Sequence, residues 1–266
     1  MKNTKNKNFT KTLIIMIVVA GLLTLGMMIL EQVRKNNDTY VAIDVDSMEL
    51  VQLNGIKNGD PIAIVETTLG EIRFVLYPEY SPNAVKNFTE LAESGYYDNT
   101  YFYNSESGVY SSAGSKDKTG TYPKGDRHER IERELNQNLW SFKGAVCCAT
   151  TDFDRSFKEM IIGGGTYYCG SRLNFLNTIE FTDELKEQML SSDTSKELVE
   201  AFIENGGIPN FAQQMTVIGQ VYQGMEIVEK LASLDATDNG YYKIPDEDIM
   251  IISITTDIYS DEKNSE

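Results

Sequence analysis

Histidine is almost absent from this sequence, which contains only His128. Cysteine is scarce as well, with three residues and no Cys-x-x-Cys spacing. Structural zinc sites usually combine four cysteine or histidine ligands, so this composition argues against a zinc site. His128 lies among charged neighbours, and we expect it to be a surface residue rather than a ligand or a catalytic base. We expect no metal and no cofactor.

Basic residues are also few, with 24 lysines and arginines against 40 aspartates and glutamates, and the formal net charge is −16. Binding to phosphate backbones needs a basic surface, so this balance argues against nucleic acid as a partner. The excess of acid is typical of a solvated surface. Hydrophobic residues make up 41% and aromatic residues 10% of the chain, which is the composition of a folded protein.

One long hydrophobic run stands near the N-terminus, LIIMIVVAGLLTLGMMIL at residues 13–30, and it has no charge. A helix of this length rises about 27 Å, close to the hydrocarbon thickness of a bilayer. Residues 1–12 form a basic tail with four lysines, which should stay in the cytoplasm. We therefore expect a single-pass protein of the cell membrane with an extracytoplasmic C-terminal part. A cleaved signal peptide is the alternative, but the flank Met-Met-Ile-Leu-Glu at 27–31 has no small-x-small pattern.

The remaining sequence divides into three parts. Residues 31–58 are polar and indicate a linker with one short strand at 48–53. Residues 59–257 predict a folded domain, in which residues 171–208 contain two amphipathic helical patterns that indicate a helical insertion. Residues 258–266 form an acidic tail.

Within the domain, short strands dominate. A helix is expected to begin at Pro82 with Ser81 as its N-cap, and a second helix is expected over 225–231. Since closing a sheet removes its exposed edges, many short strands of this kind favour a closed barrel. The apolar patterns predict strands at 62–67, 71–77, 100–104, 109–113, 143–150, 165–170, 215–221 and 249–255.

Several stretches between Pro61 and Thr256 resemble the cyclophilin family of peptidyl-prolyl isomerases. The resemblance implies a mainly β fold, a closed eight-stranded antiparallel barrel with two capping helices. The similar stretches are VETTLGEI at 65–72, SPNAVKNF at 81–88, GYYD at 95–98, GQV at 219–221 and GMEIV at 224–228.

The resemblance also implies where a proline would bind. The family carries Phe-His-Arg on one strand, with the arginine as its main catalytic group, and the matching triplet here is Phe102-Tyr103-Asn104. Gly165 to Tyr168 stand where the family has Ser-Gln-Phe-Phe. The prolyl groove implied in this way consists of Phe102, Asn104, Val109, Tyr110, Ser112, Ala149, Thr150, Thr166, Tyr168, Phe211 and Met215.

Rotation about an X-Pro bond crosses a barrier of about 20 kcal/mol because the amide C–N bond is partly double. A catalyst has to bind the twisted amide better than the planar forms, and a charged arginine fork suits that task. Asn104 is shorter and neutral. Losing one such contact typically costs about 3 kcal/mol, a hundredfold in rate. Arg73 lies on a different strand, and no sequence feature lets it substitute, so we expect weak or lost activity with peptide binding retained.

Three interpretations stay open. The domain is a working isomerase helped by its tyrosines, or it binds proline-containing or unfolded exported polypeptides without much catalysis, or it is a structural module that works through residues 171–208. A groove floored by Val109, Ala149 and Tyr168 would favour the first two. A groove filled by Tyr110 or covered by the insertion would favour the third.

The three cysteines cannot all pair within one chain. Cys147 and Cys148 are consecutive on a predicted strand and should point to opposite faces. We expect Cys148 and Cys169 to face the barrel interior at neighbouring positions. The sequence leaves open whether they form a disulfide or are small buried hydrophobic residues.

Overall fold

The computed structural model describes residues 16, 22–33, 40–122, 130–192 and 194–261. The chain divides into two compact units, Met1–Thr39 with Phe153–Thr166, and Tyr40–Asp152 with Tyr167–Glu266.

The smaller unit contains a helix over 22–33 and the short helix α3 (Phe157–Ile162). Ser156 and Glu159 form a capping box at the start of α3, each side chain bonding the backbone of the other residue. Among the helices that the structure describes, none has both the length and the apolar character needed to span a bilayer. Residues 13–15 and 17–21 of the expected membrane segment lie outside the described residues.

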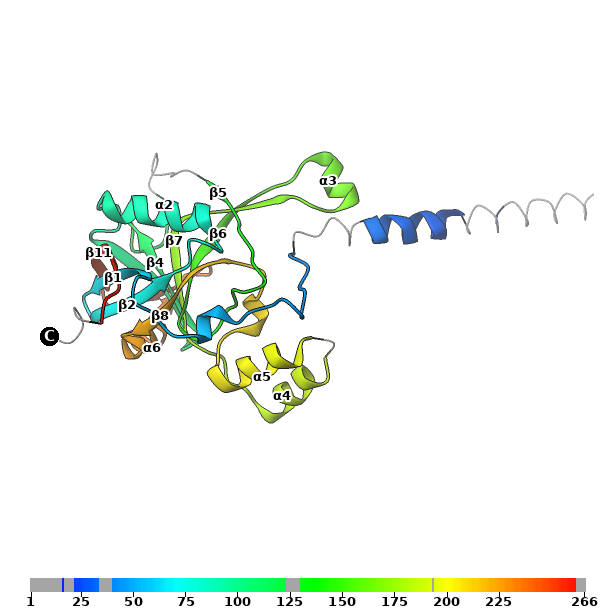
Figure 1. Ribbon diagram of the computed structural model, residues 1–266. Helices are drawn as coiled ribbons and strands as arrows, with labels where there is room; N and C mark the ends of the chain where they lie inside the picture. The colour runs from blue at the N-terminus through cyan, green and yellow to red at the C-terminus, as the bar shows by residue number, and fades with distance from the viewer. Residues whose placement is uncertain (1–15, 17–21, 34–39, 123–129, 193, 262–266) are drawn as a thin grey trace, which may run out of the picture. The chain divides into compact units, whose positions relative to one another are not determined.

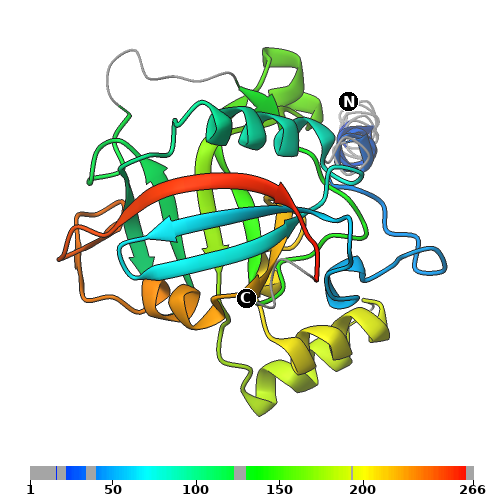
Figure 2. The same cartoon turned by 60° about the vertical axis from the view of Figure 1, so that its left-hand side comes forward.

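The larger unit is a closed β-barrel (Figures 1 and 2). The strands run in the order β4-β3-β11-β1-β2-β8-β6-β7, and pairing of β4 with β7 closes the ring, which confirms the eight-stranded barrel. The resolved registers are antiparallel. The strands are β1 (Pro61–Thr67), β2 (Gly70–Leu76), β3 (Thr100–Glu106), β4 (Tyr110–Ser115), β6 (Ala145–Asp154), β7 (Thr166–Leu176), β8 (Thr216–Gln223) and β11 (Met250–Ile258).

Three short strands and two helices lie around the barrel. β5 (Ile131–Glu132) pairs with β7, while β9 (Ala236–Asp238) and β10 (Lys243–Pro245) form a separate two-stranded sheet. Figure 2 shows α2 (Pro82–Glu93) and α6 (Met225–Ala232) at opposite ends of the barrel. The predicted face of α2 is buried in the main core. That core also holds the inward side chains of the first hairpin, including Ala63, Val65, Ile72 and Phe74.

The start of α2 differs from the sequence prediction. Ser81 stands at the N-cap but makes no capping hydrogen bond, because its hydroxyl donates to the carbonyl oxygen of Val217 at 2.7 Å. The carboxylate of Glu134 accepts from the backbone N–H groups of Asn83 and Ala84 at 3.2 and 2.8 Å instead. The N-terminus of α2 is therefore capped by a carboxylate from a distant segment and not by the local serine.

The helical insertion is shorter than predicted. Residues 171–176 continue β7, and the helices are α4 (Asp183–Leu190) and α5 (Lys196–Asn205). The apolar face of α5 packs on the barrel through Phe202, whose ring centroid lies 4.6 Å from that of Phe142. A 3-10 turn η2 (Pro209–Phe211) then leads back toward β8.

The short strand expected at 48–53 is absent from the described structure, where a 3-10 turn η1 (Val51–Leu53) takes its place. Gln52 is buried there and holds the turn against the barrel. Its side-chain nitrogen donates to the carbonyl oxygen of Trp140 at 3.0 Å, and its side-chain oxygen accepts from the Trp140 backbone N–H at 2.5 Å. This long-range pairing fixes the backbone in a turn that local propensity does not specify.

The cysteines are all buried and free. Cys148 and Cys169 belong to the same buried core cluster, as the sequence predicted. The hydrogen bond between their thiols, together with burial, raises the pKa of Cys148. Both sulfurs are therefore small buried groups in this structure rather than a disulfide.

Candidate functional site

A cavity of about 260 Å³ opens in the larger unit where β3, β4, β6 and β7 meet. Ligand pockets for drug-sized molecules span roughly 300–1,000 Å³, so this one suits a single residue and its peptide bond. It is lined by Tyr103, Tyr110, Ser112, Tyr122, Ala149, Thr150, Thr151, Arg172, Asn174 and Tyr242.

Ser112 on β4 connects the two strands that flank it. It pairs with Asn104 of β3 on one side and with Asn174 of β7 on the other. Its hydroxyl donates to Oδ1 of Asn174 at 2.8 Å. Side chains from β3 and β7 are therefore brought into one cavity by register alone.

Six of the sequence-predicted groove residues lie in or beside this cavity. Tyr110, Ser112, Ala149 and Thr150 line it. Phe211 packs its ring 5.3 Å from that of Tyr110. The sulfur of Met215 accepts a hydrogen bond from Nδ2 of Asn174, which does line the cavity, at 3.0 Å. Tyr110 forms part of the wall and leaves the cavity open.

Two predicted residues of β3 and the following turn lie elsewhere. Phe102 is buried in the main core, where its ring centroid lies 5.8 Å from that of Phe175. Val109 is half-buried and does not line the cavity, although it belongs to the apolar cluster that also holds Tyr110, Phe211 and Met215. Both side chains contribute to packing rather than to the wall of the cavity. Residues 177–208 of the insertion do not line the cavity either.

The two predicted residues at the start of β7 are also placed elsewhere. Thr166 belongs to the smaller unit. Tyr168 lies outside the residues that line the cavity, and its ring faces the guanidinium of Arg130 at 3.9 Å. Arg172 and Asn174, each six residues further along β7, line the cavity instead. The segment from Ser171 to Asn174 therefore occupies the place that the sequence comparison gave to 165–168.

Asn104 is buried, with 2% of its surface exposed, but it is not one of the cavity-lining residues. Its Oδ1 accepts from the backbone N–H of Lys243 at 2.8 Å. The ammonium group of Lys243 in turn pairs with the carboxylate of Glu106. Asn104 thus ties β10 to β3.

Arg172 is the residue that the sequence analysis missed. It is 1% exposed, and its guanidinium carbon lies 5.0 Å from the ring centroid of Tyr103 and 4.2 Å from that of Tyr122. Nη2 donates to the carbonyl oxygens of Gly120 and Thr121 at 3.3 and 3.5 Å. Nε and Nη1 have no hydrogen-bond partner in the described part of the chain.

No carboxylate in the described ranges forms an ion pair with Arg172. The other arginine weighed from the sequence, Arg73, is bound to Glu71 at 2.7 Å. A buried arginine without a partner charge is unusual, because buried charges are generally paired. The one sequence signal for this position is a charged residue within the otherwise uncharged stretch YYCGSRLNFL at 167–176.

Two of the tyrosines that line the cavity, Tyr103 and Tyr110, have a raised pKa. Burial raises the pKa of Tyr103, against an opposing effect of Arg172. Burial, followed by the nearby Glu106, raises the pKa of Tyr110. Both hydroxyls can therefore act as hydrogen-bond donors at neutral pH.

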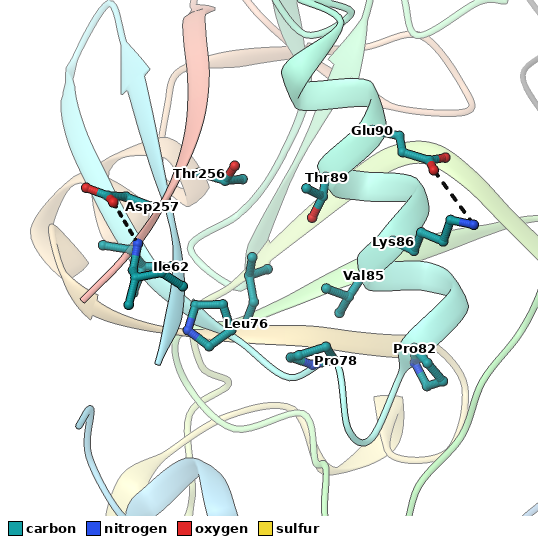
Figure 3. A pocket seen from close by; sticks show the side chains of 12 residues that line it. Ile62, Leu76, Pro78, Pro82, Val85, Lys86, Thr89, Glu90, Thr256 and Asp257 are labelled. Atoms are coloured by element: carbon teal, nitrogen blue, oxygen red, sulfur yellow. Dashed lines mark hydrogen bonds and ion pairs between the residues drawn. The ribbon is translucent and has the colours of Figure 1, made fainter. Parts of the chain in front are cut away.

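A second and larger cavity, of about 630 Å³, lies between α2 and the ends of β1, β2 and β11 (Figure 3). Its wall is mainly aliphatic and proline side chains, with the Lys86–Glu90 ion pair of α2 at 3.8 Å on its rim. None of the sequence-predicted site residues lines it, and neither does any buried polar side chain lacking a partner in the described part of the chain. We therefore take the smaller cavity, with Arg172, as the candidate site.

A family model for the cyclophilin type peptidyl-prolyl cis-trans isomerases matches residues 62–256, which is most of the chain. The chain belongs to the cyclophilin family. It is a divergent member, because the relatives found by sequence are only distantly similar. A Staphylococcus saprophyticus protein assigned to the peptidyl-prolyl cis-trans isomerases is 28% identical over 204 residues, covering 76% of this chain and 95% of the relative.

A Staphylococcus aureus protein with the same assignment is 26% identical over 204 residues, again covering 76% of this chain and 95% of the relative. Among solved structures, a Cryptosporidium parvum cyclophilin type isomerase, crystallised in the presence of the dipeptide Ala-Pro, superposes with a TM-score of 0.50 and 21% identity. That comparison covers 75% of this chain and 99% of the other, and it supports the barrel fold of the cyclophilin domain.

Proposed function

We propose that the cyclophilin domain binds proline-containing segments in the 260 Å³ cavity and accelerates rotation about the X-Pro bond. One observation carries this proposal. Tyr110, Ser112, Ala149 and Thr150, which the family resemblance assigned to the prolyl groove, line one open cavity together with a guanidinium. Weak or lost activity was expected because position 104 lacks an arginine, and Arg172 removes the main reason for that expectation.

The chemistry requires no covalent intermediate, so the site has to provide shape and hydrogen-bond donors. The cavity offers the phenols of Tyr103 and Tyr110 and the guanidinium of Arg172, within a wall that is partly apolar. A twisted X-Pro amide exposes a more basic nitrogen and a more carbonyl-like oxygen than the planar amide, and preorganised donors stabilise such a state.

The test uses the full chain in a mild detergent and a short peptide containing Ala-Pro. Exchange between the cis and trans peptide resonances is measured by NMR with and without the protein. We expect the wild-type chain to accelerate exchange. Peptide binding without acceleration would support the binding-only alternative, and the absence of both would contradict the proposal.

Two cavity-filling variants give a matched comparison. Ala149→Trp fills the candidate site, and Thr256→Trp fills the larger cavity beside α2. The proposal predicts that Ala149→Trp abolishes peptide binding and catalysis and that Thr256→Trp leaves both close to wild type. The reverse pattern would move the peptide site to the cavity beside α2.

The same proposal includes a place in the cell. The uncharged run at 13–30 and the lysines of residues 1–12 support an anchor with a cytoplasmic N-terminus, so the domain would act on exported polypeptides outside the membrane. The acidic excess of the rest of the chain would keep it away from an anionic membrane surface. Protease added to intact cells should degrade the domain, and full protection of the domain would contradict this location.

A further inference from the structure

We infer that Arg172 is the catalytic cation of this site, donating hydrogen bonds to the X-Pro peptide group from β7. This inference rests on the proposed function, because it names the group that performs it. The family arginine is implied at position 104 on β3, whereas Arg172 lies on the other side of β4. A guanidinium would therefore reach the cavity from β7 and not from β3.

The first argument is the charge of Arg172. Arg172 is 1% exposed and has no ion-pair partner among the described residues. The two tyrosine rings and the two long hydrogen bonds offset only part of the cost of desolvating this charge. Such a group is more readily explained by a ligand that supplies electron-rich atoms than by a structural role.

The second argument is that two donor atoms of the guanidinium have no hydrogen-bond partner in the described structure. Nη2 is held by the carbonyl oxygens of Gly120 and Thr121, and the plane is flanked by the rings of Tyr103 and Tyr122. The ring contacts hold the guanidinium in place, while Nε and Nη1 are left without partners in the described structure. A donor that is already held in place loses little freedom when a peptide group arrives.

The third argument is that Asn104 is engaged elsewhere. Its Oδ1 accepts from the backbone N–H of Lys243 at 2.8 Å, which ties Asn104 to β10. Of the ten residues that line the cavity, Arg172 is the one that carries a positive charge. Ser112 pairs with Asn104 on one side and with Asn174 on the other, so β3 and β7 approach the same cavity from opposite sides.

No bond forms or breaks in the step. As the X-Pro bond twists, the lone pair of the prolyl nitrogen becomes localised, and the free N–H groups of Arg172 donate to the peptide group in that geometry. The contact is stronger in the twisted state than in the planar states, which is the condition for acceleration.

Three variants test the role of Arg172 in the exchange assay with the Ala-Pro peptide. Arg172→Gln removes the charge, and we expect about a hundredfold loss in catalysed exchange at saturating peptide, with little change in the peptide dissociation constant. Arg172→Lys keeps the charge without the fork and should give an intermediate rate. Arg133→Gln is the matched control, because Arg133 also stacks on a tyrosine, Tyr167 at 4.2 Å, but does not line the cavity.

The outcomes separate this inference from the proposed function. A wild-type chain without catalysis would remove the proposed function itself. A wild-type chain that catalyses, together with folded Arg172→Gln and Arg172→Lys variants that catalyse equally well, would overturn the role of Arg172 alone. Should Arg172→Gln fail to fold, the intermediate or wild-type rate of Arg172→Lys decides the matter.

Discussion

The charge of Arg172 predicts an unusual effect on stability. Arg172→Met removes the buried charge and leaves a shorter, flexible apolar side chain. If the guanidinium is present for a ligand and not for the fold, the free protein should lose little stability from this change and could gain some. Functional groups are often held at the expense of stability in this way.

The magnitude follows from the contacts. Each stacking contact of the guanidinium, on Tyr103 and on Tyr122, contributes about 1–2 kcal/mol when desolvated. The two hydrogen bonds, at 3.3 and 3.5 Å, are longer than the usual range and contribute little. Against these stands a desolvation penalty of several kcal/mol for a buried ion, on the order of 5 kcal/mol. We expect a change between zero and about 3 kcal/mol in favour of Arg172→Met.

The assay is thermal unfolding of the full chain in detergent, followed by circular dichroism. For a domain of this size, 1 kcal/mol corresponds to a shift in midpoint of about 2–4 °C, so the midpoint should stay constant or rise by up to about 10 °C. Arg133→Met is the control, and it should lower the midpoint, because Arg133 is half-buried and donates to the carbonyl oxygen of Gln214 at 3.1 Å. A loss of several kcal/mol in Arg172→Met would refute the reasoning, since Arg172 would then be a structural residue.

Three further predictions concern the candidate site and the segment beside it. In denaturant unfolding, Gly120→Ala should destabilise the domain by about 1–3 kcal/mol more than Gly59→Ala does. Both glycines have positive φ, but only at Gly120 would the new Cβ meet the ring of Tyr103, at 2.5 Å. Equal destabilisation by the two variants would contradict this prediction. The pH profile of catalysed exchange should be flat from about pH 6 to pH 9, because the cavity lining contains no histidine, cysteine or carboxylate and burial raises the pKa of Tyr103 and of Tyr110 above the ordinary value. An inflection in that range would point to another group. Hydrogen bonds from the hydroxyl and the backbone N–H of Thr119 lower the pKa of Asp117 below its ordinary value of 3.8. The ionised carboxylate of Asp117 therefore stabilises the fold above that pH, and this stabilisation is lost as the pH falls further. Asp117→Asn should remove the corresponding loss of stability in acid.

Local patterns were sufficient for much of the barrel. Alternation predicted the hairpin of β1 and β2, and helical spacing predicted the buried face of α2, because both elements carry their pattern within a few residues. The cap of α2 could not be predicted in the same way. The hydroxyl of Ser81 is taken by the carbonyl oxygen of Val217, and the capping carboxylate comes from Glu134, so both partners are distant in sequence.

The site was predicted in part for a related reason. Tyr110 and Ser112 follow β3 without a gap, so their placement needed only a count along the chain. On β7, the segments 165–168 and 171–174 are both strand-like, and the pairing of Ser112 with Asn174 decides between them. Comparing the sequence with the family motif does not give the register between β4 and β7, and Arg172 was missed as a consequence.

The most direct test of the account follows the Nε–H resonance of Arg172 by NMR while the Ala-Pro peptide is added to the wild-type chain, with Arg172→Lys to assign the signal. The account predicts that this resonance moves downfield and saturates at the same peptide concentration as the backbone signals of Ser112 and Ala149. If those backbone signals shift and the Arg172 signal stays in place, the peptide occupies the cavity without contacting the guanidinium, and the central claim is wrong.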